Sequence, residues 1–168
     1  MISNKFLFSI VVPCYNVEDT LKATIESILK QDFKNYEIVA VDDGSFDNTP
    51  TILKNFEIKN NIKVITQSNK GLGAARNAGI KASEGIYICL LDADDLWVPN
   101  KLTKIYQIIR NKKYSLVTND EIIFGNKYLF YLRNSPPKNL SNLLISGNTL
   151  SPSAITIKKE IFDKVGLF

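Results

Sequence analysis

Three carboxylates crowd together in this chain, because Asp92, Asp94 and Asp95 follow directly on the apolar run 86–91. Carboxylates this close repel one another, and their pKa values rise unless a positive charge lies between them. Oxygen ligands suit Mg²⁺ and Mn²⁺, and Mg²⁺ takes one or two protein carboxylates while phosphates and water fill its other positions. A divalent-cation site is therefore one hypothesis. The other is an acidic helix start, in which Asp95 or a neighbour caps the helix that begins near Pro99.

A second pattern combines glycines with basic residues after the predicted strand 62–66. Gly71 and Gly73 permit an unusual turn at the start of a helix, and Lys70 and Arg76 flank them. Free backbone N–H groups and cations at a helix start suit a diphosphate. A dinucleotide fingerprint would need a third glycine where Arg76 stands. The alternative is close packing of small residues against a sheet, and both can hold together.

The composition is typical of a soluble globular domain without imidazole chemistry. The 168 residues are 45% hydrophobic and 23% charged, and no apolar run is long enough to cross a bilayer. The absence of histidine excludes His-based triads and His-ligated metal sites. Cys14 and Cys89 lie in apolar runs without metal-ligand spacing, which predicts buried, reduced thiols. The run 6–12 is interpreted as a buried strand rather than a lipoprotein signal, because Pro13 stands where a small residue should precede cleavage.

Alternating strands and helices must position these residues. The predicted strands are 6–12, 36–41, 62–66 and 86–91, and the predicted helices are 18–31, a segment from Pro50 with Thr49 as its cap, and 73–83. Pro13 is expected to end the first strand. This order indicates a parallel sheet with right-handed crossovers. Because the carboxyl ends of parallel strands share one edge, Tyr15, Asp42, Asp43 and the acidic cluster should converge on one site.

The pattern beyond Pro99 is shorter and less regular. A helix there is expected to turn Leu102, Ile105, Tyr106, Ile108 and Ile109 inward. Further strands are predicted near 114–118, 122–124, 128–132 and 154–157, with a short helix around Leu140, Leu143 and Leu144. We see no repeat and no low-complexity linker, so we expect one domain over residues 1–168.

The net charge of +4 is unevenly distributed. Residues 1–100 carry 10 Lys and Arg against 13 Asp and Glu, whereas residues 101–168 carry 11 against 4. The basic surplus includes Lys101, Lys104, Arg110, Lys112 and Lys113, on or just after the helix that follows Pro99. We favour a solvated helix face. The alternative is peripheral contact with an anionic membrane surface or a phosphorylated lipid acceptor.

Four motifs in this order and spacing resemble the family 2 glycosyltransferases, which have the GT-A nucleotide-diphospho-sugar fold. The motifs are SIVVPCYN (9–16), VDDGS (41–45), NKG with ARN (69–71 and 75–77) and LDADD (91–95). The resemblance is continuous over about residues 6–110 and weaker beyond. It implies an α/β, Rossmann-like fold with a mostly parallel sheet flanked by helices. It also implies a donor-binding half over about 1–110 and an acceptor half that begins at 111.

The resemblance assigns roles to individual residues. Pro13 and Tyr15 match the turn that frames the nucleobase, and Asp43, with Asp42 as the alternative, matches the carboxylate that hydrogen-bonds the base. Lys70, Gly73 and Arg76 match further donor-binding positions. Asp92 and Asp94 match the DXD motif, in which the second aspartate binds Mn²⁺ or Mg²⁺ and the first faces the ribose, with Asp95 assisting.

The implied reaction is inverting transfer of a sugar from a nucleotide-diphosphate donor, commonly UDP-linked, to a hydroxyl of a saccharide or lipid-linked acceptor. The acidic motif that supplies the family's general base is expected beyond Phe168, so we expect the fold to be truncated at its C-terminus. Asp120, Glu121, Glu160 and Asp163 do not match its position. We expect a cytoplasmic location, at the inner face of the membrane if the basic surplus contacts lipid, a role in bacterial surface polysaccharide synthesis, and no nucleic-acid partner. The alternatives are a nucleotidyltransferase of similar fold and a non-catalytic binding module.

Overall fold

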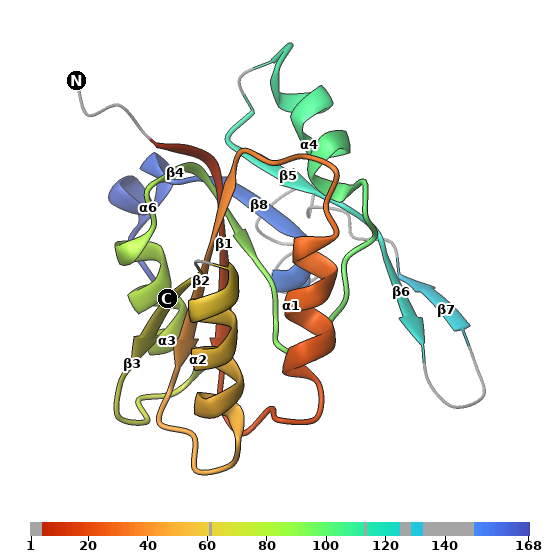
Figure 1. The fold of residues 1–168 in the computed structure, drawn as a ribbon. Coiled ribbons are helices and arrows are strands. Elements are labelled where there is room, and N and C mark those ends of the chain that lie inside the picture. The colour runs from red at the N-terminus through yellow and green to blue at the C-terminus, as the bar shows by residue number, and fades with distance from the viewer. Residues whose placement is uncertain (1–4, 61, 113, 125–128, 133–149) are drawn as a thin grey trace.

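A six-stranded sheet forms the centre of the molecule (Figure 1). The computed structural model describes residues 5–60, 62–112, 114–124, 129–132 and 150–168. The strand order is β3-β2-β1-β4-β8-β5, and β1 to β4 run parallel while β8 is antiparallel to β4 and β5. The strands are β1 (Phe6–Cys14), β2 (Tyr36–Asp42), β3 (Lys63–Thr66), β4 (Gly85–Leu90), β5 (Leu116–Thr118) and β8 (Ile155–Lys158).

The central strand β1 is longer than its sequence predicts. Pro13 does not end it, because Pro13 pairs with Val41 and the strand continues to Cys14. The pairing of β1 with β4 stops at Val11. Proline is tolerated where a strand has lost one neighbour, since its missing N–H interrupts no ladder bond on that side.

Helices cover both faces of the sheet (Figure 1). On one face α1 (Leu21–Leu29), α2 (Thr49–Asn60) and α4 (Lys101–Ile109) contribute to the larger core with alternate residues of β1. On the other face α3 (Leu72–Ala82) packs Ile80 against Val11, and Phe162 of α6 (Glu160–Val165) lies beside them. This double coverage explains why β1 reads as a continuous apolar run rather than an alternating one.

Three local predictions for the helices are wrong. Helix α1 is shorter than 18–31. Thr49 does not cap α2, because its hydroxyl accepts the Val17 N–H at 2.9 Å and Asp47 accepts the Thr49 N–H. Tyr106 and Ile108 are exposed rather than inward, since the buried stripe of α4 is Leu102, Ile105 and Ile109.

The rear of the chain supplies the antiparallel strands. The predicted strand 154–157 is β8, the strand predicted at 114–118 is β5, and the predicted pair is the separate hairpin β6 (Glu121–Phe124) and β7 (Leu129–Leu132). A 3₁₀ turn, η1 (Pro152–Ala154), precedes β8. The helix predicted around Leu140 lies outside the described residues. Within the described parts, no helix is both long and apolar enough to span a bilayer.

The close approach of α3 to the sheet depends on Gly79. A Cβ atom at Gly79 would overlap the Val11 side chain and lie 3.3 Å from Cγ2 of Val41. The sequence analysis predicted close packing of small residues against the sheet, and of the alanines of α3 before Gly79 only Ala75 is buried. A glycine one turn further along is therefore the tightest point of the contact.

Gly79→Ala is expected to lower the free energy of unfolding by about 1–3 kcal/mol, because overpacking outweighs the gain in helix propensity. Gly73→Ala in the same helix is the matched control, since a Cβ there meets only ordinary contact at 3.6 Å from Phe168. Urea denaturation measures both. The penalty should shrink in a Val11→Ala background, and an equal penalty in both backgrounds would contradict this packing argument.

Candidate donor site at the carboxyl edge of the sheet

A cavity of about 290 Å³ lies where β1, β2 and α3 meet. Its lining residues are Pro13, Cys14, Tyr15, Asp43, Asn69, Gly71, Leu72 and Ala75. The structure therefore brings Pro13, Tyr15 and Asp43 to one edge with the start of α3, which is far from them in sequence. Asp42 and the acidic cluster, which were predicted to converge on the same site, do not line this cavity. The carboxyl edge of an open parallel sheet is the usual place for a ligand.

The Asp43 carboxylate organises the loop that follows β3. It accepts hydrogen bonds from Gln67 Nε2 at 2.6 Å and from the backbone N–H groups of Lys70 and Gly71 at 3.0 and 2.8 Å. Asp43 is buried, so these donors compensate the loss of water. An ionised carboxylate has about four acceptor positions, which leaves one for a ligand. This anchoring role was not predicted from the sequence.

The turn after β2 is tied to the turn after β1. Asp42 accepts the Ser45 N–H at 3.0 Å, and Asn16 exchanges hydrogen bonds with Ser45 and Phe46. Gly44 has φ of 77°, and a Cβ there would lie 2.8 Å from Asn69 N. Only glycine fits this position without strain. The half-exposed Tyr15 ring meets Phe46 edge-on across the joined turns.

The start of α3 presents unpaired donors beside this cavity. Gly71 has φ of 87°, and no side chain of the described residues caps the helix there. The first N–H groups of a helix have no partner within the helix. Lys70 is exposed, and Gly73 lies in the first turn of α3. These features suit an anion. The diphosphate site stays a prediction.

Arg76 joins α3 to the acidic segment. Its guanidinium forms an ion pair with Asp92 at 2.7 Å between Nη2 and Oδ1. Arg76 is only 8% exposed, and its Nε has no hydrogen-bond partner among the described residues. The guanidinium also lies over the Phe168 ring, 5.7 Å from its centroid. A buried N–H left unpaired is costly, so this atom fits a ligand acceptor such as a phosphate oxygen.

The three acidic residues after β4 have different surroundings. Asp92 pairs with Arg76 and donates its N–H to Ser153 Oγ at 3.0 Å, whereas Asp94 is exposed and has no partner in the described parts of the chain. Burial raises the pKa of Asp95, a hydrogen bond with Ser153 opposes this, and the charges of Asp94, Asp92 and Glu121 raise the pKa further.

This donor set fits Mg²⁺ or Mn²⁺ in its chemistry, since it is all oxygen and its like charges need a cation. The described residues contain no preassembled group of three possible ligands. Asp92 is already neutralised by Arg76, so a cation would draw on Asp94 first.

The helix-cap alternative for the acidic cluster is wrong. Helix α4 begins at Lys101, whose N–H bonds to Val98 O, and the Leu102 N–H bonds to Gln31 Oε1 at 3.1 Å. No Asp side chain of the cluster makes either bond. The start of α4 is therefore capped by a buried glutamine from the region of α1.

Polar side chains of α1, with Gln31 just beyond its end, hold the segment 93–100 in place. Thr24 donates to Ala93 O at 2.8 Å, and Ser27 Oγ accepts the Trp97 N–H at 3.1 Å. Gln31 adds a bond from its Nε2 to Val98 O at 2.7 Å. All three side chains are buried. The apolar periodicity of α1 predicted its packing face but not these contacts.

Lys101 departs from the predicted basic helix surface. It is 7% exposed, donates to Ser153 O at 2.7 Å and lies 4.2 Å from the Trp97 ring centroid. Burial lowers its pKa to about 8, although nearby Cys89, Glu121 and Asp95 oppose the shift. Lys101 is thus not available to a membrane surface. A lysine at the first position of a helix gives no sequence signal that it is buried.

The cysteines lie as predicted. Cys14 and Cys89 are buried and free. Burial raises the pKa of both thiols, to about 11 at Cys89. Neither thiol is therefore set up as a nucleophile at neutral pH.

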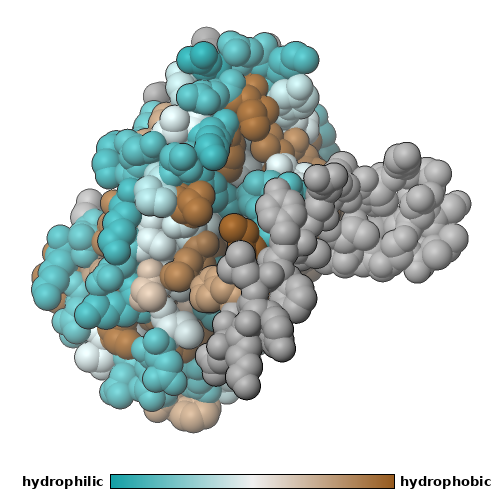
Figure 2. Space-filling view, turned by 90° about the vertical axis from the view of Figure 1, so that its right-hand side faces the viewer, coloured by the Kyte–Doolittle hydropathy of each residue, from teal (hydrophilic) through white to brown (hydrophobic). Residues whose placement is uncertain are grey.

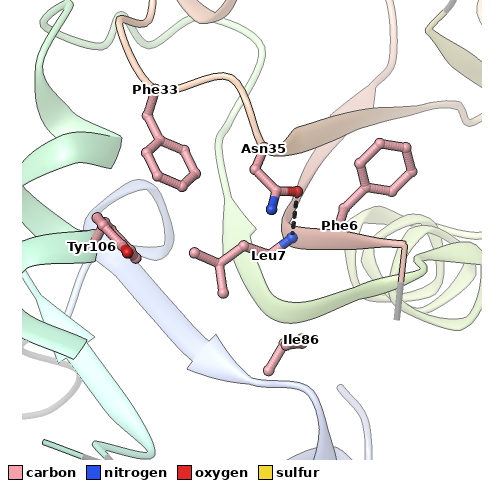
Figure 3. Close-up of a pocket in the computed structure, with 6 residues that line it drawn as sticks. All are labelled: Phe6, Leu7, Phe33, Asn35, Ile86 and Tyr106. Atoms are coloured by element: carbon pink, nitrogen blue, oxygen red, sulfur yellow. Dashed lines mark hydrogen bonds between the residues drawn. The ribbon is translucent and has the colours of Figure 1, made fainter. Parts of the chain in front are cut away.

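Another cavity, of about 440 Å³, lies at the opposite edge of the sheet (Figure 3). Its lining residues are Phe6, Leu7, Phe33, Asn35, Ile86 and Tyr106. The Asn35 side chain is occupied with the Leu7 N–H, at 3.1 Å. No charged side chain lines this cavity, so it offers no group for acid–base or metal chemistry.

Comparison with known proteins agrees with this geometry. Residues 9–166 match the family model described as Glycosyl transferase family 2. The chain belongs to this family. A crystal structure of S. aureus TarS 1-349 in complex with UDP-GlcNAc is similar, with a TM-score of 0.77 and 27% identity over 95% of this chain and 47% of that chain. The mannosyltransferase PcManGT from Pyrobaculum calidifontis shares the fold at a TM-score of 0.70 and 19% identity, over 96% of this chain and 47% of its own. The expected GT-A fold is confirmed.

Two bacterial relatives are more similar in sequence. UDP-Glc:alpha-D-GlcNAc-diphosphoundecaprenol beta-1,3-glucosyltransferase WfgD of Escherichia coli is 40% identical over 123 residues, covering 72% of this chain and 48% of WfgD. Glycosyltransferase GlyG of Streptococcus pneumoniae is 40% identical over 124 residues, covering 73% of this chain and 39% of GlyG. The chain thus spans about half the length of these relatives or less.

Asp43→Asn is expected to lower the free energy of unfolding by about 2–3 kcal/mol. An amide NH₂ would replace one carboxylate oxygen, and as a donor it cannot accept the N–H groups that now bond to that oxygen. Amide hydrogen exchange at Lys70 and Gly71 should accelerate at the same time. The matched control is Asp19→Asn, an exposed carboxylate whose loss should leave stability unchanged within about 0.5 kcal/mol. Unchanged protection at Lys70 and Gly71 would mean that Asp43 does not hold the loop.

Proposed function

We propose that this chain forms the donor-binding part of a glycosyltransferase that uses a nucleotide-diphosphate sugar, most simply a UDP-sugar. The observation that carries the proposal is the shared cavity of Tyr15, Asp43 and the α3 start, where Arg76 follows the lining residue Ala75 in sequence. WfgD is named for a UDP-glucose donor, and TarS was crystallised with UDP-GlcNAc. The proposed site also includes Pro13, Asp42, Lys70, Gly73 and Asp92.

The cavity offers complementary groups to a nucleoside diphosphate. Tyr15 exposes an aromatic ring, and Asp43 retains one acceptor position for a base N–H. The uncapped start of α3, the unpaired Nε of Arg76 and the nearby Lys70 ammonium would face the diphosphate. Binding of the diphosphate by these groups positions the donor. It also lowers the free-energy barrier to departure of the nucleoside diphosphate, because its negative charge is stabilised.

Asp94, with Asp92 and Asp95, is proposed to hold Mn²⁺ or Mg²⁺ together with the diphosphate. When bound, the ion supplies Lewis-acid stabilisation of the leaving group. Asp92 keeps its ion pair with Arg76 and so fixes the guanidinium toward the phosphates. Asp94 is free to turn to the ion.

Transfer is proposed to proceed with inversion to a hydroxyl of a saccharide or lipid-linked acceptor, in bacterial surface polysaccharide synthesis. WfgD is named for a lipid-diphosphate-linked acceptor. A single displacement needs a general base near the acceptor hydroxyl. We assign no residue of this chain to that role. The proposed place of action is the cytoplasm, at the inner face of the membrane where a lipid-linked acceptor would be met.

A nucleotidyltransferase of the same fold is a weaker candidate. Such enzymes favour a glycine-rich loop with a basic residue directly after the first strand, whereas β1 is followed here by Tyr15 and Asn16. A non-catalytic nucleotide-sugar-binding module has the same donor cavity, and only turnover distinguishes it.

UDP with Mn²⁺ at about 100 times Kd is expected to raise the Tm by about 5–10 °C, because binding at this excess stabilises by about 2.7 kcal/mol. Differential scanning fluorimetry measures the shift. Asp94→Ala should remove the part of the Tm shift that depends on Mn²⁺. It should also weaken Mn²⁺ binding at least about tenfold, as measured by electron paramagnetic resonance. Asp163→Ala, an exposed carboxylate on α6, is the control.

An unchanged melting curve at millimolar UDP and Mn²⁺ would contradict the donor-site proposal. If UDP raises the Tm equally with and without metal, and equally in Asp94→Ala, nucleotide binding is supported and the proposed role of the metal is contradicted.

A further inference from the structure

The last described residues of the chain return to α3 (Figure 1). Helix α6 ends at Val165, and Gly166 follows it with φ of 90°, a backbone conformation that favours glycine. The Gly166 N–H bonds to Phe162 O at 3.0 Å, which closes the end of the helix. The chain turns sharply there, and two residues later the backbone of Phe168 contacts α3.

The Asn77 side chain holds the backbone of Phe168 at two points. Its Nδ2 donates to Phe168 O at 2.7 Å, and its Oδ1 accepts the Phe168 N–H at 3.0 Å. Two opposed hydrogen bonds to one residue fix both its position and its direction, as in a hydrogen-bonded pair of a β-ladder. Asparagine is a weak helix former, so helix propensity does not account for Asn77 within α3. Because both bonds go to the backbone, the Phe168 side chain remains available for other contacts.

The Phe168 side chain rests on one face of α3. Its ring centroid lies 5.7 Å from Cζ of Arg76, and its Cβ would lie 3.6 Å from a Cβ added at Gly73. Gly73, Arg76 and Asn77 are spaced as i, i+3 and i+4, which places them on the same helix face. The centroid of the Phe162 ring of α6 lies 6.4 Å from that of the Phe168 ring, and Phe162 itself packs against the smaller core. Phe168 is therefore in contact with both α3 and α6.

Arg76 is thereby held by two groups. Its Nη2 pairs with Asp92 Oδ1 at 2.7 Å, and its guanidinium lies within the range of a cation–π contact with the Phe168 ring. A single N–O contact is monodentate, so it leaves the guanidinium plane free to turn about that contact. The aromatic ring restricts this rotation.

Neither contact uses the Nε–H of Arg76. This donor is buried and has no hydrogen-bond partner among the described residues. A buried unpaired donor recovers its desolvation cost only when an acceptor arrives. Arginine also has a large rotamer entropy, and contacts that fix its side chain before the ligand binds remove that cost from the binding step. The Phe168 ring therefore prepares Arg76 for an acceptor.

We propose that Asn77 and Phe168 are positioning residues for Arg76, in which Asn77 seats Phe168 on α3 and the Phe168 ring holds the guanidinium with its Nε–H toward the donor's diphosphate. The inference rests on the proposed function, because the diphosphate is the acceptor assigned to Arg76 there. Neither positioning residue touches the nucleotide, and both act through Arg76. A contact from the rear of the chain thus sets the affinity of an arginine in the front half.

The first test compares UDP with uridine, which has the base and ribose but no diphosphate. Phe168→Leu keeps an apolar side chain and removes the aromatic face. The Kd for UDP with Mg²⁺, measured by calorimetry, should rise about three- to fivefold. The Kd for uridine, measured by NMR titration, should stay unchanged. Phe168→Tyr keeps the ring and should bind UDP as the parent chain does.

Asn77→Ala tests the seat of the ring. It should weaken UDP binding about as much as Phe168→Leu, and the double variant should bind no more weakly than the weaker single variant, because both changes remove the same support of Arg76. Asn55→Ala is the matched control, an exposed asparagine within α2. Additive losses in the double variant would show that Asn77 does not act through Phe168.

Phe124→Leu is the matched control for the ring. Phe124 is 63% exposed and Phe168 is 59% exposed, so the same change is made at a similar solvent exposure. Phe124 belongs to β6, which lies on the right in Figure 1, whereas α3 lies on the left. Figure 2 shows that apolar side chains gather in the middle of that right-hand face. UDP affinity should be unchanged in Phe124→Leu.

A spectroscopic readout follows Arg76 itself. The chain has three arginines, so the Nε–H cross-peak of Arg76 is assigned in ¹⁵N-labelled protein by its loss in Arg76→Lys. The peak should move in Phe168→Leu without nucleotide, because the ring current of Phe168 is lost. In the parent chain it should move with UDP but not with uridine.

The outcomes separate the two proposals. UDP binding by the parent chain with equal affinity in Phe168→Leu, or an equal loss of UDP and uridine affinity in that variant, overturns this inference alone. So does an Arg76 peak that Phe168→Leu leaves in place. Absence of UDP binding by the parent chain contradicts the donor site, and this inference with it.

Discussion

The carboxylates at the carboxyl edge of the sheet must be hydrogen-bonded where the sheet ends, and this requirement shapes the surrounding loops. Asp42 and Asp43 are buried at the end of β2, and their donors are backbone N–H groups of the next turn and of the loop after β3, together with the Gln67 side chain. An unpaired carboxylate there would cost several kcal/mol. The loops that donate hydrogen bonds to these two carboxylates therefore also form the donor cavity.

The same requirement explains why α1 carries buried polar residues. The segment 93–100 has no regular structure of its own, so its backbone groups need partners from elsewhere. Thr24 and Ser27 of α1 supply them together with Gln31, which lies two residues beyond the helix and also caps α4. Helix α1 thus does two tasks on one face, since its apolar residues fill the core and its polar residues fix the segment that carries Asp94 and Asp95.

The alternation of strands and helices, and the convergence of strand ends, could be predicted because they depend on periodicity and on parallel topology alone. Pairing of individual side chains could not. The periodic pattern predicts a solvated Lys101. In the structure Lys101 is buried against Trp97 and donates to Ser153 O in η1. The anchoring role of Asp43 depends mostly on backbone N–H donors, which every residue type except proline carries. The overlap at Gly79 likewise needs the distance between α3 and β1, which composition does not encode.

Ser153 connects the two cavities physically. Its hydroxyl accepts the Asp92 N–H and bonds to Asp95, while its carbonyl accepts from Lys101. Asp92 in turn holds Arg76, the neighbour in sequence of Ala75 in the donor cavity, and Asp95 and Lys101 line another cavity, of about 550 Å³, together with Trp97. A displacement of η1 would therefore move the polar groups of both cavities together. Because η1 comes from the rear of the chain and Arg76 from the front, the acidic segment is positioned correctly only when both halves are folded against β4.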